Sequence, residues 1–266
     1  MRASTATHDA REIEPLAEAA RVDPEPMVRS EAVRSLGALG GEKVASILRD
    51  LWANADDGVR EDIAIAWAAP ETYAHGGRES LRVLVASKTG PGVIAGASAV
   101  ARVAPNDREL RESAVGLLVR SIATAPRRDR LFAIAVAPIG EADVLSALRK
   151  AAHEDDVETK VSAFARLLES APDHAEAQQS LETLAGQSYG ALSGRARFAL
   201  ASGGDLRIQA WIEADLAATD PHTRLSAVGA LAALGRSARG ALLLADPDPS
   251  VRAVAACTLL SAPRSR

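Results

Sequence analysis

The sequence contains few of the residues on which disulfide-stabilised folds and most active sites depend. It has one cysteine among 266 residues, Cys257, which excludes an intramolecular disulfide and a zinc site built from several cysteines. Cys257 lies in an apolar helical run, so we expect it to be a small buried side chain. Aromatic residues make up only 3% of the chain, and the core must therefore be formed mainly by aliphatic side chains.

Other familiar signatures are also missing. The five histidines have no metal-ligand spacing, and there is neither a phosphate-binding loop nor a serine-nucleophile motif. We therefore predict no metal site, no cofactor and no catalytic residues, and expect that the protein is not an enzyme. No apolar run approaches the length of a membrane span, and the first residues lack the apolar core of a secretion signal. These absences predict a cytoplasmic protein without membrane contact.

A motif that recurs about every 32 residues organises the chain. Three segments align without gaps, residues 28–36, 223–231 and 251–259, and each has a basic second residue. Their apolar residues follow the helical spacing i, i+3, i+4 and i+7. Acidic or proline-containing turns precede the copies, and glycine or proline often follows. The pattern predicts one all-α domain over 1–266, with flexible ends at 1–8 and 262–266.

The pattern places the helices in two alternating sets. First helices are expected near 25–38, 57–69, 92–103, 127–137, 156–170, 189–201, 221–234 and 249–261. Second helices are expected near 42–53, 77–87, 107–124, 141–153, 173–186, 204–217 and 236–245. An opening helix near 9–20 would cover the end of the first pair. The last unit has one helix only, which indicates a truncated array or an end that pairs with another molecule.

The pattern Asp-Pro-x-x-x-Val-Arg-x-x-Ala-x-x-x-Leu, carried by Asp23–Leu36 and less closely by Asp246–Leu259, resembles the HEAT repeat. It is most similar to the short bacterial form found in phycobilin lyase (PBS-lyase-type) subunits. The resemblance covers residues 9–261 and is weakest around Ala95 and Phe198. It implies an armadillo-like α-solenoid, a right-handed superhelix of about seven to eight helix pairs with the second helices on the concave side.

A basic residue follows the turn in most units. Because these residues recur at one place in the repeat, we expect each to reach an aspartate in its own turn or a neighbouring one. The result would be a structural ladder of ion pairs rather than a ligand site. The members of this predicted ladder are Arg29, Arg60, Arg130, Lys160, Arg224 and Arg252.

Positive charge is concentrated between residues 78 and 130, where ten basic residues face five acidic ones in a chain of net charge −4. Such a patch would hold phosphates or an acidic protein segment. The alternative is a solvated face whose charges pair along the helices. The arginines expected to form a concave binding patch are Arg78, Arg82, Arg108, Arg111 and Arg149.

Three functions follow from these patterns. The preferred one is a scaffold or adaptor that binds an extended protein or peptide on its concave face, with the oligomeric state left open and a monomer as the default. The second is binding of a nucleic-acid backbone, since one branch of HEAT-like proteins comprises DNA glycosylases. Such an enzyme would need an aromatic ring beside a carboxylate, and Trp211 with Glu213 and Asp215 is the nearest approach. However, we expect Trp52, Trp67 and Trp211 to lie apart and to pack in the core. The third, a bilin-lyase-like subunit, is supported by the resemblance alone.

Overall fold

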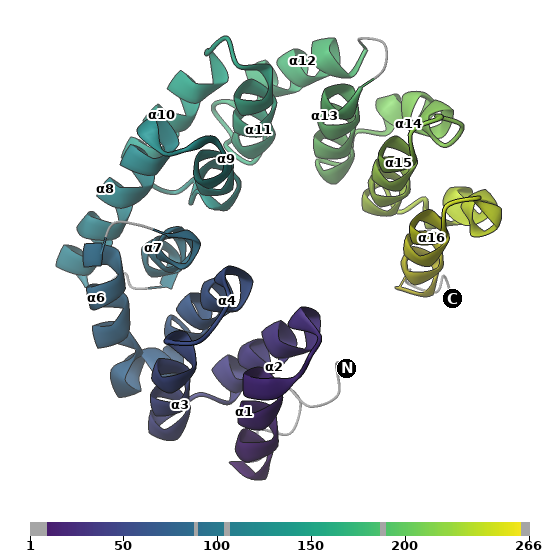
Figure 1. The fold of residues 1–266 in the computed structure, drawn as a ribbon. Coiled ribbons are helices and arrows are strands. Elements are labelled where there is room, and N and C mark those ends of the chain that lie inside the picture. Colours follow the sequence, from purple (N-terminus) through teal and green to yellow (C-terminus); the bar gives the residue numbers. More distant parts are fainter. Residues whose placement is uncertain (1–9, 88–89, 104–106, 187–189, 262–266) are drawn as a thin grey trace. The chain divides into compact units, whose positions relative to one another are not determined.

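The computed structural model describes residues 10–87, 90–103, 107–186 and 190–261 (Figure 1). These residues form sixteen α-helices and no strand, which confirms the predicted α-solenoid. The chain divides into two compact units, residues 1–147 and 148–266. The single domain over 1–266 stays a prediction, and the ends predicted to be flexible lie outside the described residues.

Unit 1 stacks its helices in two rows. The first row is formed by α2 (Pro26–Leu39), α4 (Asp57–Trp67), α7 (Pro91–Val103) and α9 (Arg127–Val136). The second row is formed by α3 (Glu42–Trp52), α6 (Arg78–Ser87) and α8 (Arg108–Thr124). The 3-10 turn η2 (Ala10–Glu12) and α1 (Ile13–Val22) open the chain, and α1 packs against α2. A short α5 (Pro70–Thr72) and a π-helical turn, η3 (Tyr73–Gly77), lead into α6. The division between the units falls within α10 (Ala142–Ala152).

Unit 2 continues the same alternation. Its first helices are α11 (Val157–Leu167), α13 (Ala191–Ser202), α15 (Pro221–Ala233) and α16 (Pro249–Ser261). Between them lie α12 (His174–Ala185), η4 (Leu206–Ile208) with α14 (Gln209–Asp215), and η5 (Ser237–Ala245). The last two elements differ from the predicted regular helices. Asp205 caps the backbone N–H of Arg207 and so tightens the first turn into a 3-10 turn, while Gly240 lowers the helix propensity within η5.

Aspartates start several of the first helices, as the sequence predicts. The carboxylate of Asp56 accepts a hydrogen bond from the backbone N–H of Val59 at 3.0 Å, and Asp156 accepts one from Thr159 at 2.9 Å. Asp220 caps α15 in the same way. These bonds satisfy N–H groups that have no partner within the helix, and the negative charge suits the positive end of the helix dipole.

Small residues bring the first helices of unit 1 close together. A Cβ atom placed on Gly37 of α2 would lie only 2.7 Å from the Cβ of Ala66 in α4, so the two backbones approach closely there. Figure 1 shows the row of α2, α4, α7 and α9 on the inner, concave side of this unit, and α3, α6 and α8 on its outer, convex side. The expectation that second helices line the concave side is therefore wrong for unit 1.

Two further expectations concern surface and burial. In the part of the chain that the structure describes, no helix has both the length and the apolar character needed to cross a membrane. Cys257 is exposed, so the prediction that it is buried is wrong. Its helix, α16, packs against α15 and η5, which leaves the remaining face without a neighbour among the described residues.

Candidate binding surface

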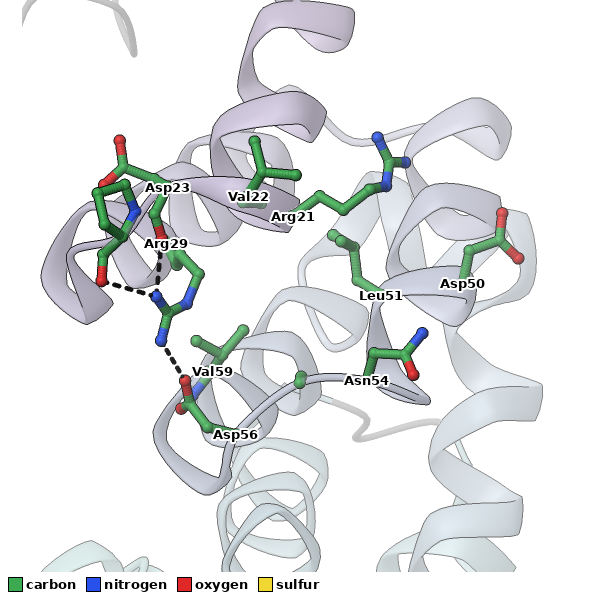
Figure 2. Close-up of a pocket in the computed structure, with 12 residues that line it drawn as sticks. Arg21, Val22, Asp23, Arg29, Asp50, Leu51, Asn54, Asp56 and Val59 are labelled. Atoms are coloured by element: carbon green, nitrogen blue, oxygen red, sulfur yellow. Dashed lines mark hydrogen bonds and ion pairs between the residues drawn. The ribbon is translucent and has the colours of Figure 1, made fainter.

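Arg29, the first member of the predicted ladder, joins two successive turns of unit 1. Its Nη2 donates to Asp56 Oδ2 at 2.6 Å, and its Nη1 donates to the carbonyl oxygens of Asp23 and Pro24 at 2.8 and 3.2 Å. Figure 2 shows the guanidinium reaching between these two turns, beside a pocket of about 530 Å³. The side chain therefore ties the start of α2 to the start of α4.

Arg224 makes an equivalent arrangement in unit 2. It donates to both carboxylate oxygens of Asp246, at 2.7 and 2.8 Å, and to the carbonyl oxygens of Ala218 and Thr219. Both charged side chains are buried, and the Arg224 guanidinium is the main cause that lowers the pKa of Asp246. Arg252 donates to the backbone carbonyl of Asp246 at 2.8 Å. Both arginines thus bind the turns that precede first helices, through backbone carbonyl oxygens as well as through the Asp246 carboxylate.

The other members of the ladder have different surroundings. Arg60 donates to the Trp52 carbonyl oxygen at 3.3 Å and lies 5.7 Å from the centroid of the Trp52 ring. Arg130 donates to the Ile122 carbonyl oxygen at 2.6 Å. Lys160 has no side-chain hydrogen bond or ion pair within the described ranges. The repeated basic position therefore does not have one fixed partner.

The arginines predicted to form a concave patch are all paired with carboxylates. The pairs are Arg78 with Asp107, Arg82 with Glu79, Arg108 with Glu112, Arg111 with Glu141, and Arg149 with Asp173. The first four arginines belong to α6 and α8, on the outer side of unit 1, whereas Arg149 belongs to unit 2. Because Glu141 lies outside residues 78–130, its pair with Arg111 adds a negative charge that the sequence count omits.

Arg78 and Arg82 line a groove of about 610 Å³ between α6 and α8, which we call the charged groove. Its lining residues are Arg78, Arg82, Val85, Ala86, Asp107, Glu109, Leu110, Glu112, Ser113, Gly116 and Arg120. Among them, the Asp107 carboxylate accepts three hydrogen bonds. The donors are the backbone N–H of Leu110, which it caps, Tyr73 Oη at 3.0 Å, and the Arg78 guanidinium. The Arg78 guanidinium is the main cause that lowers the pKa of Asp107.

A second groove, of about 500 Å³, lies between α3 and α6, and its walls are mainly apolar. We call it the apolar groove; its lining residues are Arg49, Trp52, Trp67, Glu79, Ser80, Val83, Leu84, Ser87 and Val93. Val83, in the middle of α6, is 64% exposed on this wall. An exposed aliphatic side chain beside two tryptophans is typical of a surface that another molecule covers.

The two tryptophans of the apolar groove pack against each other. Their ring centroids are 5.1 Å apart and the ring planes are tilted by 33°. Gly92 makes room for them, since a Cβ there would lie 2.6 Å from Trp52 Cη2. The prediction that the tryptophans lie apart is therefore wrong for Trp52 and Trp67. Trp67 is buried as expected, but within the described residues its indole N–H has no hydrogen-bond partner.

Arg49 supplies a positive charge to this groove. Its guanidinium makes no hydrogen bond or ion pair with any described residue. Glu79, by contrast, pairs with Arg82 at 2.9 Å, and the hydroxyl groups of Ser80 and Ser87 donate to nearby backbone carbonyl oxygens. The apolar groove therefore combines an apolar wall with an unpaired positive charge.

Trp211 does not form the arrangement that a glycosylase would require. It is 41% exposed, so the expectation of a core position is wrong. Asp215 is buried and bonded to Arg197 Nη1 at 2.5 Å, and Glu213 accepts from Gln209 at 2.7 Å. Both carboxylates near Trp211 are thus engaged with other side chains. Over the described ranges, no cluster of His, Cys, Asp or Glu is arranged to hold a metal ion.

Comparison with known proteins gives a family for the first quarter of the chain. Residues 3–68 match the family described as HEAT repeats. No curated protein matches the sequence significantly. Among the solved structures that match is human deoxyhypusine hydroxylase in complex with glycerol, with 15% identity, a TM-score of 0.43, and coverage of 94% of this chain and 95% of that chain. Because that structure belongs to an enzyme, the prediction that this chain is not an enzyme is contradicted.

Proposed function

We propose that this chain binds a partner protein through the apolar groove of unit 1, because its residues 3–68 match HEAT repeats and such repeats commonly mediate protein–protein interaction. The observation that carries the proposal is the exposed Val83 beside the Trp52–Trp67 pair. A volume of about 500 Å³ is within the range of ligand pockets, and it fits a short stretch of a partner chain.

The energetic basis of this interaction is burial of apolar surface. An apolar side chain that becomes fully buried contributes roughly 1.5–3 kcal/mol. Tryptophan is enriched among the residues that dominate binding energy, because it offers a large surface with few rotatable bonds. A partner that inserts one or two apolar side chains beside Val83 and the tryptophans would therefore gain most of its affinity there.

The inner row of unit 1 offers a different surface from the apolar groove. Ile65 of α4 is 51% exposed there, but nearby Asp62 pairs with Arg34 at 2.9 Å. The inner side therefore presents charged pairs beside Ile65 instead of an apolar wall. We accordingly place the binding site on the outer side, and not on the concave face that the sequence suggested.

A matched pair of substitutions tests the proposal. A random peptide library displayed on phage is selected against the intact protein, and the affinity of enriched peptides is measured by fluorescence anisotropy. We expect Val83→Gln, which adds no charge, to weaken binding about tenfold, equivalent to about 1.4 kcal/mol of lost apolar contact. Ile65→Gln replaces another exposed aliphatic residue, in the inner row, and should leave binding unchanged.

Thermal unfolding of both variants checks that they remain folded. Both positions are exposed, so the substitutions should have little effect on stability. Equal affinity of the enriched peptides for wild-type protein and the Val83→Gln variant would show that the groove is not the docking site. Failure to enrich any peptide would also contradict the proposal.

A further inference from the structure

We infer that the partner segment bound in the apolar groove carries an acidic side chain close to its apolar anchor. This inference rests on the proposed function and adds the chemistry of the partner. Two observations lead to it: the unpaired Arg49, and the spacing of Arg49 from Trp52.

Arg49 is held beside the groove, and no carboxylate of the described residues pairs with it. It lies on α3, and a Cβ atom added to Gly76 would be only 2.9 Å from Arg49 Nη1, so the guanidinium lies against the backbone of η3. Gly76 has φ +118°, a conformation that favours glycine and leaves room for the arginine. Two arginines of the neighbouring charged groove, Arg78 and Arg82, have carboxylate partners.

The unpaired charge of the groove is a hydrogen-bond donor. A guanidinium can donate hydrogen bonds but cannot accept them. A carboxylate on an occupant can bind a guanidinium with two parallel hydrogen bonds. A basic segment would instead meet the unpaired positive charge of Arg49.

The geometry of α3 sets the distance between the two features of the partner. Arg49 and Trp52 are three residues apart on one helix, so their Cβ atoms are neighbours at about 5–6 Å. In an extended peptide, side chains two positions apart lie on the same face at about 7 Å. The acidic residue should therefore be one or two positions from the apolar residue that contacts Trp52 and Val83.

Charge reversal at Arg49 tests this inference. Each enriched peptide is compared with a version in which its acidic residue is replaced by lysine. For the wild-type protein we expect the acidic version to bind about tenfold more tightly at low salt, with the difference falling as salt rises. Arg49→Glu should abolish or reverse this preference. Arg108→Glu makes the same change of charge on α8, at a side chain that is 90% exposed, and should preserve the preference.

The outcomes separate the inference from the proposed function. If Val83→Gln weakens binding but Arg49→Glu leaves the preference for acidic peptides intact, the inference is wrong and the docking site stands. If Arg108→Glu removes the preference as strongly as Arg49→Glu does, the preference reflects overall charge, and the inference is again wrong. If Val83→Gln has no effect, the docking site itself is wrong.

Discussion

Helix α6 separates two grooves that are built alike and differ in chemistry. Toward α3, the apolar groove has Val83 and Leu84 on its α6 wall and an unpaired Arg49 opposite. Toward α8, the charged groove has Arg78 and Arg82 on its α6 wall, and both arginines are paired with carboxylates. Each groove lies between outer helices of neighbouring pairs, so the repeat architecture alone does not decide what the surface binds.

The difference comes from the stripes of side chains on α6. Residues three or four apart share a face of a helix. Ser80, Val83, Leu84 and Ser87 therefore point to one groove, and the stripe that includes Arg78 and Arg82 points to the other. Two stripes of a single ten-residue helix thus give one mainly apolar surface and one surface of balanced charges.

The largest expected difference between the grooves concerns one glycine in each. In the apolar groove region, a Cβ on Gly92 would lie 2.6 Å from Trp52 Cη2 and 3.2 Å from the Arg60 carbonyl oxygen, so Gly92→Ala should destabilise the protein by about 1–3 kcal/mol. In the charged groove, a Cβ on Gly116 would meet only the flexible end of Arg120, at 3.4 Å. Gly116→Ala should therefore stabilise α8 by about 0.5–1 kcal/mol.

Chemical denaturation of the two alanine variants measures both effects. Fluorescence of Trp52 and Trp67, in a Trp211→Phe background, reports on unit 1. A neutral Gly92→Ala substitution would show that the tryptophan pair is not tightly packed, and it would weaken the contrast between the grooves.

An intermediate effect is expected at Asp107 of the charged groove. Arg78, followed by other hydrogen-bond donors, holds the pKa of Asp107 below its ordinary value. A carboxylate with a depressed folded-state pKa stabilises the protein above its unfolded pKa, about 3.9, and this contribution is lost as the pH falls through the folded pKa. Asp107→Ala also removes the cap of α8, so we expect a loss of about 1 kcal/mol at pH 7.

The pH dependence of this loss distinguishes the two grooves. Urea denaturation at pH 7 and in acid should show that the difference between wild-type protein and Asp107→Ala shrinks at low pH, because the wild-type carboxylate is then protonated. Val83→Gln contains no titratable group and serves as the control with a constant difference. An undiminished effect of Asp107→Ala in acid would contradict the assigned role of its charge.

The sequence predicts the helices that form both grooves much better than it predicts how the side chains lining them pair with one another. Apolar periodicity and aspartate turns locate α3, α6 and α8 to within a few residues, because these signals are local. Charge counting fails as a guide to the patch, because the partner of a charged residue can be distant in the chain. Glu141, which pairs with Arg111 of α8, is 30 residues further along the chain, after the end of α9.

The pairing of Trp52 and Trp67 is a different kind of omission. The two residues end consecutive helices, α3 and α4. Their contact depends on how these helices pack and on Gly92, which leaves room for the Trp52 ring. The convex position of the groove likewise depends on close contacts, such as that of Gly37 with Ala66. Such contacts join residues that are distant in the chain, so the local sequence does not predict them.

The smallest expected effect links the two grooves through Arg82. Its pair with Glu79 is exposed on both sides, at 65% and 62%, so Arg82→Gln should change stability by no more than about 0.5 kcal/mol. However, it releases Glu79, which lines the apolar groove and would then oppose the acidic residue of a bound peptide. We expect the preference for acidic over lysine-containing peptides to fall about twofold. Adding Glu79→Gln should restore it, as measured by anisotropy. A preference that stays unchanged in Arg82→Gln would mean that the charges of the two grooves are independent, and that Arg49 alone sets the electrostatics of the apolar groove.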